Sequence, residues 1–243
     1  MTPTFAENPA HQNPAPTSTP ASQDALPADG TARRIAVVSA GLSQPSSTRM
    51  LADRLAEATS SRLQDKGIRV RVDTIELRDH ARDITNNMLA GFPSPALATV
   101  LETVIGADGL IAVSPVFAAS YSGLFKSFFD IVDPETLAEM PVLIGATGGT
   151  PRHSLALEHA LRPLFAYLRA DVTPTGVFAA SADWGAADDS ETARNTLASL
   201  PERIERASVQ FARAVAASDR SSRVQDPFAL DPSFSPTGGF TAT

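Results

Sequence analysis

The sequence contains no cysteine, one tryptophan and two tyrosines in 243 residues. The absence of cysteine excludes disulfides, thiolate metal sites, iron–sulfur clusters and a cysteine nucleophile. Lys and Arg (20) are outnumbered by Asp and Glu (27), whereas nucleic-acid-binding proteins are typically basic. No segment approaches the ~20 continuous apolar residues that a membrane-spanning helix needs. We therefore expect neither nucleic acid nor a membrane among its partners.

Two terminal segments differ in composition from the rest of the chain. Residues 1–32 hold six of the 19 prolines and no Lys or Arg, and residues 219–243 hold further Pro and Gly. Such segments bury too little apolar surface to offset the entropy lost on ordering, so we expect disordered tails. The first segment also lacks the basic start and apolar stretch of a secretory signal. These features predict a single cytoplasmic domain over residues 33–218.

Between the tails, strand-like segments alternate with helix-like segments. The expected strands cover residues 33–39, 68–77, 109–113, 141–146 and 171–178, and the expected helices cover residues 46–66, 94–106, 120–132, 151–169 and 201–217. Such alternation is typical of a parallel sheet with right-handed crossovers. We predict an α/β three-layer sandwich with helices on both faces of a five-stranded parallel sheet of flavodoxin-like order 2-1-3-4-5. Ligands of such sheets bind beyond the carboxyl ends of the strands, which makes the loops after the first, third and fourth strands the candidate site.

The loop after the first strand is rich in hydroxyl groups. Five Ser or Thr residues lie just before the expected helix, namely Ser39, Ser43, Ser46, Ser47 and Thr48. Hydroxyls and the unpaired N–H groups of a helix start can bind a phosphate. The Gly-x-Gly-x-x-Gly and Gly-Lys-Ser/Thr motifs are both absent, which favours a phosphate monoester over a pyrophosphate. The alternative is an ordinary polar loop in which Ser46 or Ser47 only caps the helix.

The loops after the third and fourth strands offer flat or open surfaces. Pro115 directs its loop rigidly away from the strand, and Phe117 either faces a planar ligand or packs in the core. Lys126, in the following helix, is predicted to form a structural ion pair or to bind a carbonyl oxygen rather than to act as a catalytic base. Gly148 and Gly149 allow a ligand to approach the backbone closely, although a plain strand–helix connection also explains them.

Three stretches taken together resemble one protein family. They are residues 39–49, the Pro115-Val116-Phe117-x-x-Ser120-Tyr121-x-Gly123-Leu124-x-Lys126 stretch, and Ala146-Thr147-Gly148-Gly149-Thr150-x-x-His153 followed by Leu161-Arg162-Pro163-Leu164. In this order and spacing, over about residues 33–185, the chain resembles the NADPH-dependent FMN reductases of the flavodoxin-like superfamily. Within that family it is similar to the reductase partners of two-component alkanesulfonate monooxygenases and their actinobacterial relatives.

The resemblance implies a set of cofactor-binding residues. The FMN phosphate would be held by Ser39, Ser43, Ser46, Ser47 and Thr48; the ribityl chain and isoalloxazine would contact Pro115, Val116, Phe117 and Ser120; and the other ring edge would contact Thr147, Gly148 and Gly149. The second cofactor, NADPH or NADH, would bind at Arg152 and His153. The chain departs from many relatives, which have Tyr at position 117 and Gly-Ser-x-Arg in the first loop, where this chain has Gly-Leu-Ser-Gln-Pro.

Pro163 falls inside the expected helix 151–169. Its ring collides with the carbonyl group of His159 and it has no N–H to donate, so the helix must kink or form a π-bulge there. The sulfonate-system reductases have a π-helical insertion in this helix at their subunit interface. The resemblance thus implies a homodimer or homotetramer with His159 at an interface near the flavin, whereas the alternative is a plain surface histidine.

The function implied by the resemblance is hydride transfer from NAD(P)H to FMN, with reduced FMN supplied to a flavin-dependent monooxygenase. No catalytic side chain and no metal are expected, because the sequence shows no acid–base motif and His11 and His80 are too scattered for a metal site. Alternatives are an FMN-containing quinone, azo or chromate reductase on the same fold, a flavodoxin-type electron carrier, or a binding module without turnover. The scarcity of Trp and Tyr and the basic Arg152 speak against the carrier.

Overall fold

The structure, a computed structural model, describes residues 32–184, 198–218 and 220. The two predicted tails therefore lie outside the described residues, apart from Ala32 and Arg220. Ala32 already pairs with Arg69 between the first two strands. The Arg220 side chain donates hydrogen bonds to the carbonyl oxygens of Thr136 and Ala138.

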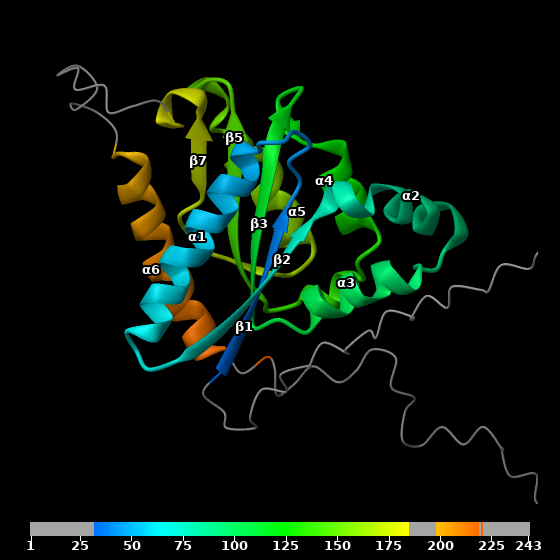
Figure 1. Cartoon of the computed structure of the whole chain (residues 1–243), viewed down its shortest axis with the longest axis horizontal. Coiled ribbons are helices and arrows are strands. Elements are labelled where there is room, and N and C mark those ends of the chain that lie inside the picture. The colour runs from blue at the N-terminus through cyan, green and yellow to red at the C-terminus, as the bar shows by residue number, and fades with distance from the viewer. Residues whose placement is uncertain (1–31, 185–197, 219, 221–243) are drawn as a thin grey trace, which may run out of the picture. The chain divides into compact units, whose positions relative to one another are not determined.

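Seven strands form one sheet, and four of them run in the order β2-β1-β3-β5 (Figure 1). The strands are β1 (Ala32–Ser39), β2 (Arg69–Glu76), β3 (Gly109–Phe117), β4 (Ser120–Tyr121), β5 (Pro141–Gly148), β6 (Asp171–Val172) and β7 (Val177–Ala180). Only β4 pairs antiparallel, with β3, and both β6 and β7 pair parallel with β5. The predicted flavodoxin-like order is confirmed, because β5 takes the fourth position and β6 with β7 takes the fifth.

The sheet has two strands more than the predicted five. Residues 171–178, expected as one strand, form β6 and β7 with residues 173–176 between them. Pro174 cannot donate to β5, and the N–H of Thr175 donates instead to the side chain of Gln210 at 3.1 Å. The second addition, β4, occupies the start of the expected helix 120–132. That helix begins later because Ser122 caps it, accepting from the N–H of Phe125 at 3.2 Å.

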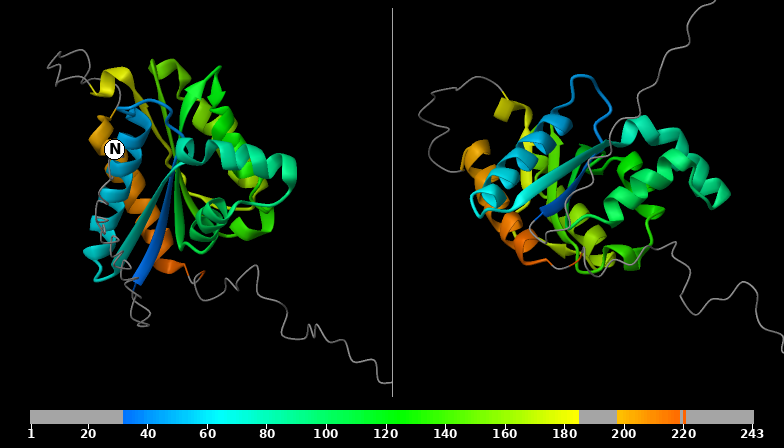
Figure 2. Two further views of the ribbon diagram at one scale, coloured as in Figure 1. Left: turned by 45° about the vertical axis from the view of Figure 1, so that its right-hand side comes forward. Right: turned by 60° about the horizontal axis from the view of Figure 1, so that its bottom comes forward.

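Helices cover both faces of the sheet (Figures 1 and 2). One face carries α1 (Ser47–Gln64) and α6 (Leu200–Ala217), and the other carries α2 (Ala81–Ala90), α3 (Pro95–Ile105), α4 (Gly123–Asp130) and α5 (Arg162–Tyr167). A separate apolar core lies on each side of the sheet. No single described helix is long and apolar enough to cross a membrane, although α2 with its preceding turn and α3 pass that test together as a bent pair.

The expected helix 151–169 is divided into three parts. Residues Pro151–His153 form a 3₁₀ turn, Leu157–Leu161 form a π-helix, and α5 follows directly from Arg162. The predicted π-bulge is thus present immediately before Pro163. The wider π turn removes the need for a hydrogen bond from Pro163, which has no N–H. Lys126 pairs with Asp130 one turn along α4, as expected of a structural ion pair.

Candidate active site

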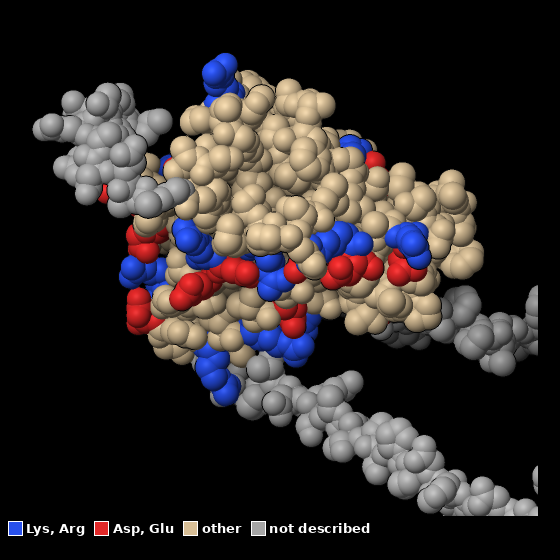
Figure 3. Space-filling view, turned by 45° about the horizontal axis from the view of Figure 1, so that its top comes forward, with Lys and Arg blue, Asp and Glu red and all other residues tan. Residues whose placement is uncertain are grey.

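A cleft of about 650 Å³ lies at the carboxyl ends of β1, β3 and β5. It is formed by the three loops that the sequence singled out and by the segment after β7. Figure 3 shows this end of the molecule, where the rim is mostly uncharged and acidic and basic side chains gather in a band farther down. The cleft is lined by Leu42, Ser43, Pro45, Ser47, Thr48, Met50, Pro115, Val116, Phe117, Thr147, Gly148, Gly149, Ser181 and Trp184. None of these side chains carries a formal charge.

The start of α1 forms one wall of the cleft. Ser46 is the cap residue, and its hydroxyl accepts a hydrogen bond from the N–H of Arg49 at 3.2 Å. A helix start leaves the N–H groups of its first residues without intrahelical acceptors, and here they belong to Ser47 and Thr48, which line the cleft. These N–H groups and the positive end of the helix dipole together form an anion-binding surface.

A buried hydroxyl pair ties the first loop to the third. The Oγ1 atoms of Thr48 and Thr147 lie 2.9 Å apart and share a hydrogen bond across the floor of the cleft. Both side chains are at most 4% exposed. A hydroxyl can donate one hydrogen bond and accept others, so the pair retains capacity for a polar ligand.

The arginine of the first loop is directed away from the cleft. Arg49 donates to Asp53 and to Glu76, each at 2.7 Å, and the hydrogen bond to Asp53 contributes most to raising the pKa of Arg49. Arg78 pairs with the same Glu76 at 2.5 Å and donates to the carbonyl oxygen of Ser43 at 2.9 Å. These contacts fix the loop against β2, and they leave anion binding in the cleft to N–H and hydroxyl groups.

The β3–β4 hairpin brings an exposed aromatic ring to the cleft. Phe117 ends β3 and is 49% exposed, so the core-packing alternative for this residue is wrong. The two turn residues after it, Ala118 and Ala119, both have positive φ (48° and 67°). Positive φ at both positions matches the tight turn that suits two antiparallel strands, but it is unfavourable for alanine. Backbone strain of this kind gathers at functional sites.

The two glycines of the third loop have different surroundings. A Cβ atom at Gly148 would lie 2.9 Å from Cζ of Phe178, so packing against this buried ring requires the glycine. A Cβ atom at Gly149 would meet no described atom within 4 Å. Protein packing therefore explains Gly148 and leaves Gly149 open toward the cleft that it lines.

The structure gathers nine of the twelve residues predicted to bind FMN into the lining of this cleft. The other three lie elsewhere. Ser46 caps α1, and Ser120 lines a neighbouring pocket. Ser39 is 1% exposed, and its Oγ atom has no hydrogen-bond partner within the described part of the chain. By strand alternation Ser39 lies on the α1 face of the sheet, as Val37 does.

Sequence reasoning missed several lining residues, of which the most informative are Ser181 and Trp184 in the segment after β7. The guanidinium of Arg54 lies over the Trp184 ring, 4.9 Å from its centre. Asp183, in the same segment, accepts a hydrogen bond from the N–H of Ala180 at 2.7 Å and pairs with Arg203 of α6 at 2.5 Å. The signal that could have indicated Ser181 and Trp184 is the polar and aromatic composition of the segment directly after the last strand.

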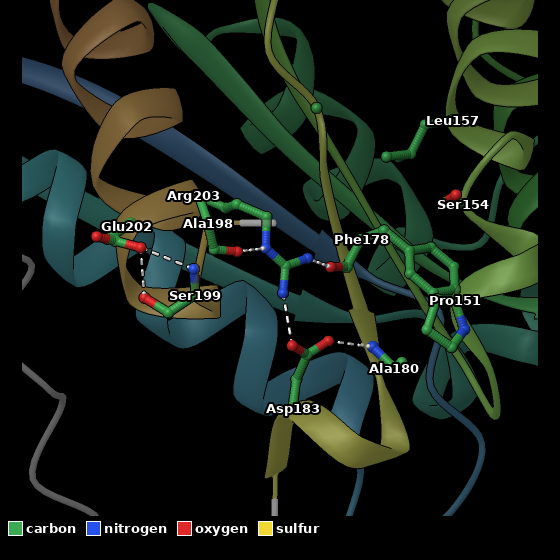
Figure 4. Close-up of a pocket in the computed structure, with 11 residues that line it drawn as sticks. Pro151, Ser154, Leu157, Phe178, Ala180, Asp183, Ala198, Ser199, Glu202 and Arg203 are labelled. Atoms are coloured by element: carbon green, nitrogen blue, oxygen red, sulfur yellow. Dashed lines mark hydrogen bonds and ion pairs between the residues drawn. The ribbon is translucent and has the colours of Figure 1, made fainter. Parts of the chain in front are cut away.

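A larger cleft of about 770 Å³ lies on the other side of β7 (Figure 4). Its charged groups already have partners in the chain. Arg203 donates to the carbonyl oxygens of Ala198 and Phe178 and pairs with Asp183. The carboxylate of Glu202 accepts from both the N–H and the hydroxyl of Ser199, the residue that caps α6. These interactions hold α6 and the segment of Trp184 together, and they leave no charged side chain in this cleft without a partner.

Comparison with known proteins assigns the family. Residues 33–185 match the sequence model of the NADPH-dependent FMN reductases. The chain belongs to this family. It is similar to FMN reductase (NADPH) of Pseudomonas aeruginosa, with 38% identity over 153 residues that cover 62% of this chain and 78% of that protein. It is also similar to the NADH-dependent FMN reductase SfnF of Pseudomonas putida, with 38% identity over 146 residues covering 60% and 76% of the two chains.

A solved structure agrees with this assignment. An oxidoreductase from Corynebacterium diphtheriae has a TM-score of 0.70 to this chain at 43% identity, over 76% of this chain and 97% of that one. Membership of the NADPH-dependent FMN reductase family makes the chain an oxidoreductase with a flavin and a nicotinamide nucleotide as its cofactors.

The residues of the cleft fit FMN. Its phosphate is a monoester, which suits the N–H groups of Ser47 and Thr48 and the hydroxyls around them. Ser39, which does not line the cleft, has a buried hydroxyl for which the described residues provide no hydrogen-bond partner. Gly149 leaves room beside the third loop where a side chain would otherwise stand. Phe117 and the uncharged lining provide the apolar surface that a flavin ring needs.

Proposed function

We propose that residues 33–218 form a reductase domain that catalyses NAD(P)H + FMN + H⁺ → NAD(P)⁺ + FMNH₂, with the flavin in the cleft of about 650 Å³. The observation that carries the proposal is the convergence of three loops and the α1 start on an uncharged cleft at the carboxyl end of the sheet. We further propose that the reduced FMN leaves for a flavin-dependent monooxygenase. The proposal includes a cytoplasmic location, because NAD(P)H is a cytoplasmic reductant.

Different residues bind the phosphate, the ribityl chain and the ring of the flavin. The α1 start, with Ser47 and Thr48, binds the phosphate through N–H and hydroxyl donors. Pro115, Val116 and Phe117 contact the ribityl chain and the ring. The backbone at Gly149 approaches the opposite ring edge, where no described atom lies within 4 Å of the position that a Cβ atom would take.

Among the described residues that line the cleft, none is an Asp, Glu, Lys or His that could donate or accept a proton. Hydride transfer requires none, because the nicotinamide donates the hydride and the flavin accepts it. The chain contributes positioning of the two rings and N–H groups near the developing negative charge. The low charge of the lining also favours exclusion of water from the reacting rings.

The direct test follows NADPH and NADH oxidation at 340 nm with added FMN, FAD or a quinone. We expect turnover that depends on free FMN. Phe117→Ala should raise the KM for FMN about 10-fold, the equivalent of about 1.4 kcal/mol, through loss of ring contact. Phe92→Ala is the matched control, since Phe92 is also exposed but lies in the turn after α2. Quinone turnover by an enzyme with tightly held FMN and no free-flavin activity would support the quinone reductase instead.

Binding can be measured separately from turnover. Trp184 is the sole tryptophan and lines the cleft, so we expect FMN to quench its fluorescence. Flavin binding by equilibrium dialysis with unchanged Trp184 emission would place the flavin elsewhere.

We propose that copies of the chain associate as a homodimer or homotetramer through the π-helical segment, with His159 at the contact. His159 is exposed in the π-helix, and Leu155 beside it is 62% exposed. His159→Ala should change the elution volume in size-exclusion chromatography. Unchanged oligomer size, flavin affinity and turnover would leave His159 as a surface residue.

A further inference from the structure

A second pocket, of about 320 Å³, lies next to the flavin cleft. It is bounded on one side by the β3–β4 turn, including Ala119 and Ser120, and on the other by the segment from Arg152 to Ala160. Both sides continue directly from the flavin cleft, because Phe117 and Gly149 line that cleft and precede the pocket residues by only two or three positions. A nucleotide whose nicotinamide reaches the flavin could therefore extend into this pocket.

The pocket has a one-sided charge. Arg152, His153 and His159 are among the described residues that line it, and no carboxylate is. His159 belongs to the proposed contact between copies of the chain, so Arg152 and His153 are the basic side chains left for a ligand. The nearest acidic residue in sequence, Glu158, is bound by Arg162 at 2.5 and 3.0 Å, which neutralises it. Within residues 32–184, 198–218 and 220, the guanidinium of Arg152 makes no ion pair or hydrogen bond, and its side chain is exposed. An arginine without a partner, beside histidines and the hydroxyl of Ser120, is suited to bind a phosphate.

The family alone does not determine which nucleotide is used. Two relatives at 38% identity are named for different reductants, NADPH in one and NADH in the other. The two nucleotides differ only by the phosphate monoester on the adenosine ribose. Discrimination between them therefore needs a cationic group at the adenosine end of the binding site, away from the hydride.

We propose that this pocket binds the 2′-phosphate of NADPH and makes the enzyme selective for NADPH over NADH. Arg152 is the specificity-determining residue, with His153 and Ser120 as additional donors to the phosphate oxygens. The inference rests on the proposed function, because it concerns the nucleotide that reduces the flavin in the neighbouring cleft. It adds the identity of that nucleotide and the residues that select it.

The kinetic test compares kcat/KM for NADPH with kcat/KM for NADH in the full-length chain. In Arg152→Ala the NADPH/NADH ratio should fall roughly 10- to 100-fold, as expected for loss of hydrogen bonds to a charged group, with the larger part of the fall in the NADPH value. His153→Ala should lower the ratio by a smaller factor. Arg82→Ala is the matched control, an exposed arginine on α2 remote from both pockets, and should leave the ratio unchanged.

A binding readout separates the inference from catalysis. Isothermal titration calorimetry with 2′-phospho-AMP and with AMP should show tighter binding of the 2′-phosphorylated probe to the wild-type chain, and a much smaller difference between the two probes in Arg152→Ala. Size-exclusion chromatography of each variant checks that the oligomer is intact. An unchanged ratio in Arg152→Ala, a wild-type preference for NADH, or equal binding of the two probes to the wild-type chain would overturn the inference. Absence of FMN reduction with either nucleotide would instead refute the proposed function.

Discussion

Thr48 in the first turn of α1 and Thr147 near the end of β5 share a buried hydrogen bond between their Oγ1 atoms, 2.9 Å apart. The two residues are 99 positions apart in sequence, and both line the cleft that we propose for the flavin. The bond therefore fixes the distance between the end of the cleft proposed for the phosphate and the edge proposed to face the ring. Two threonines, rather than one threonine and an apolar residue, also place hydroxyl groups where a ligand can use them.

Thr147→Val should weaken FMN binding about 10-fold and lower the free energy of unfolding by about 1–2 kcal/mol, because it leaves the Thr48 hydroxyl buried without its partner. Trp184 quenching measures the first effect and chemical denaturation the second. Thr59→Val is the matched control. Thr59 is buried in α1, the helix that also holds Thr48, and its hydroxyl donates only to the carbonyl oxygen of Leu55. Equal FMN affinity in the two variants would show that the hydroxyl pair is structural alone.

Replacing either of the two adjacent glycines of the third loop with alanine should have contrasting effects: one replacement should weaken FMN binding, and the other should lower the free energy of unfolding. Gly149→Ala should raise the Kd for FMN about 10-fold and change the free energy of unfolding by less than about 0.5 kcal/mol, because the new methyl group would meet no atom of the described residues within 4 Å. Gly148→Ala should lower the free energy of unfolding by about 1–3 kcal/mol, because its methyl group would crowd the Phe178 ring. Urea denaturation and flavin titration of both variants check this. If Gly149→Ala bound FMN as the wild type does, the ring would not lie against that loop.

The β3–β4 turn should gain stability from residues that accept positive φ. Ala118→Asn combined with Ala119→Gly should raise the free energy of unfolding by about 1–2 kcal/mol, since Asn-Gly suits this turn and alanine does not. Thermal and urea denaturation provide the measurement. Ala214→Gly in the last turn of α6 is the control and should lower the free energy of unfolding by up to about 0.5–1 kcal/mol. A double variant no more stable than the wild type would mean that the turn carries no strain.

The ion pair in the π-helix predicts a pH-dependent stability. The hydrogen bond from Arg162 lowers the pKa of Glu158 below its ordinary value of 4.5, so the ion pair stabilises the fold above that pH and loses its effect as the pH falls through the lowered pKa. Because Glu158 is half exposed, Glu158→Gln should cost only about 0.5–1 kcal/mol at pH 7, and the difference from the wild type should shrink as the pH falls below 4.5. Urea denaturation across pH 3–7 measures it; a difference that does not depend on pH would exclude the ion pair as its cause.

Arg162 should matter more than its acidic partner. It also donates to the carbonyl oxygens of Thr173 and Pro174, at 3.0 and 2.9 Å, and so ties the π-helix to the connection between β6 and β7. These two hydrogen bonds do not depend on the ionisation of Glu158. Acidification should therefore remove only part of the stabilisation that Arg162 provides.

The parts of the fold that were predictable are those with a strong local pattern. Long apolar runs such as 141–146 are fully buried strands, and Pro163 cannot continue a regular helix whatever it packs against. The positions of the three loops then followed from the topology of parallel sheets. The helix α2 was not expected, because Ile84 is its one buried residue and the segment therefore supplies almost nothing to the core.

The details of the site depended on contacts between distant residues. Nothing near Arg49 in sequence indicated that Glu76, 27 positions later, would turn its side chain away from the cleft. Trp184 was missed because the last strand was expected to end at residue 178, whereas β7 continues to Ala180 and carries the next segment to the cleft. The positive φ of Ala118 and Ala119 has no signal in the sequence, since alanine is atypical of such turns.

The pairing of Arg203 with Asp183 has a consequence for how the protein behaves in concentrated solution. No described strand pairs with the outer side of β7, and such a strand exposes N–H and carbonyl groups that can template pairing with another chain. Here Arg203 donates to the carbonyl oxygen of Phe178, and Asp183 accepts from the N–H of Ala180, so both groups are occupied by side chains. The ion pair thus protects the end of the sheet against strand addition and aggregation.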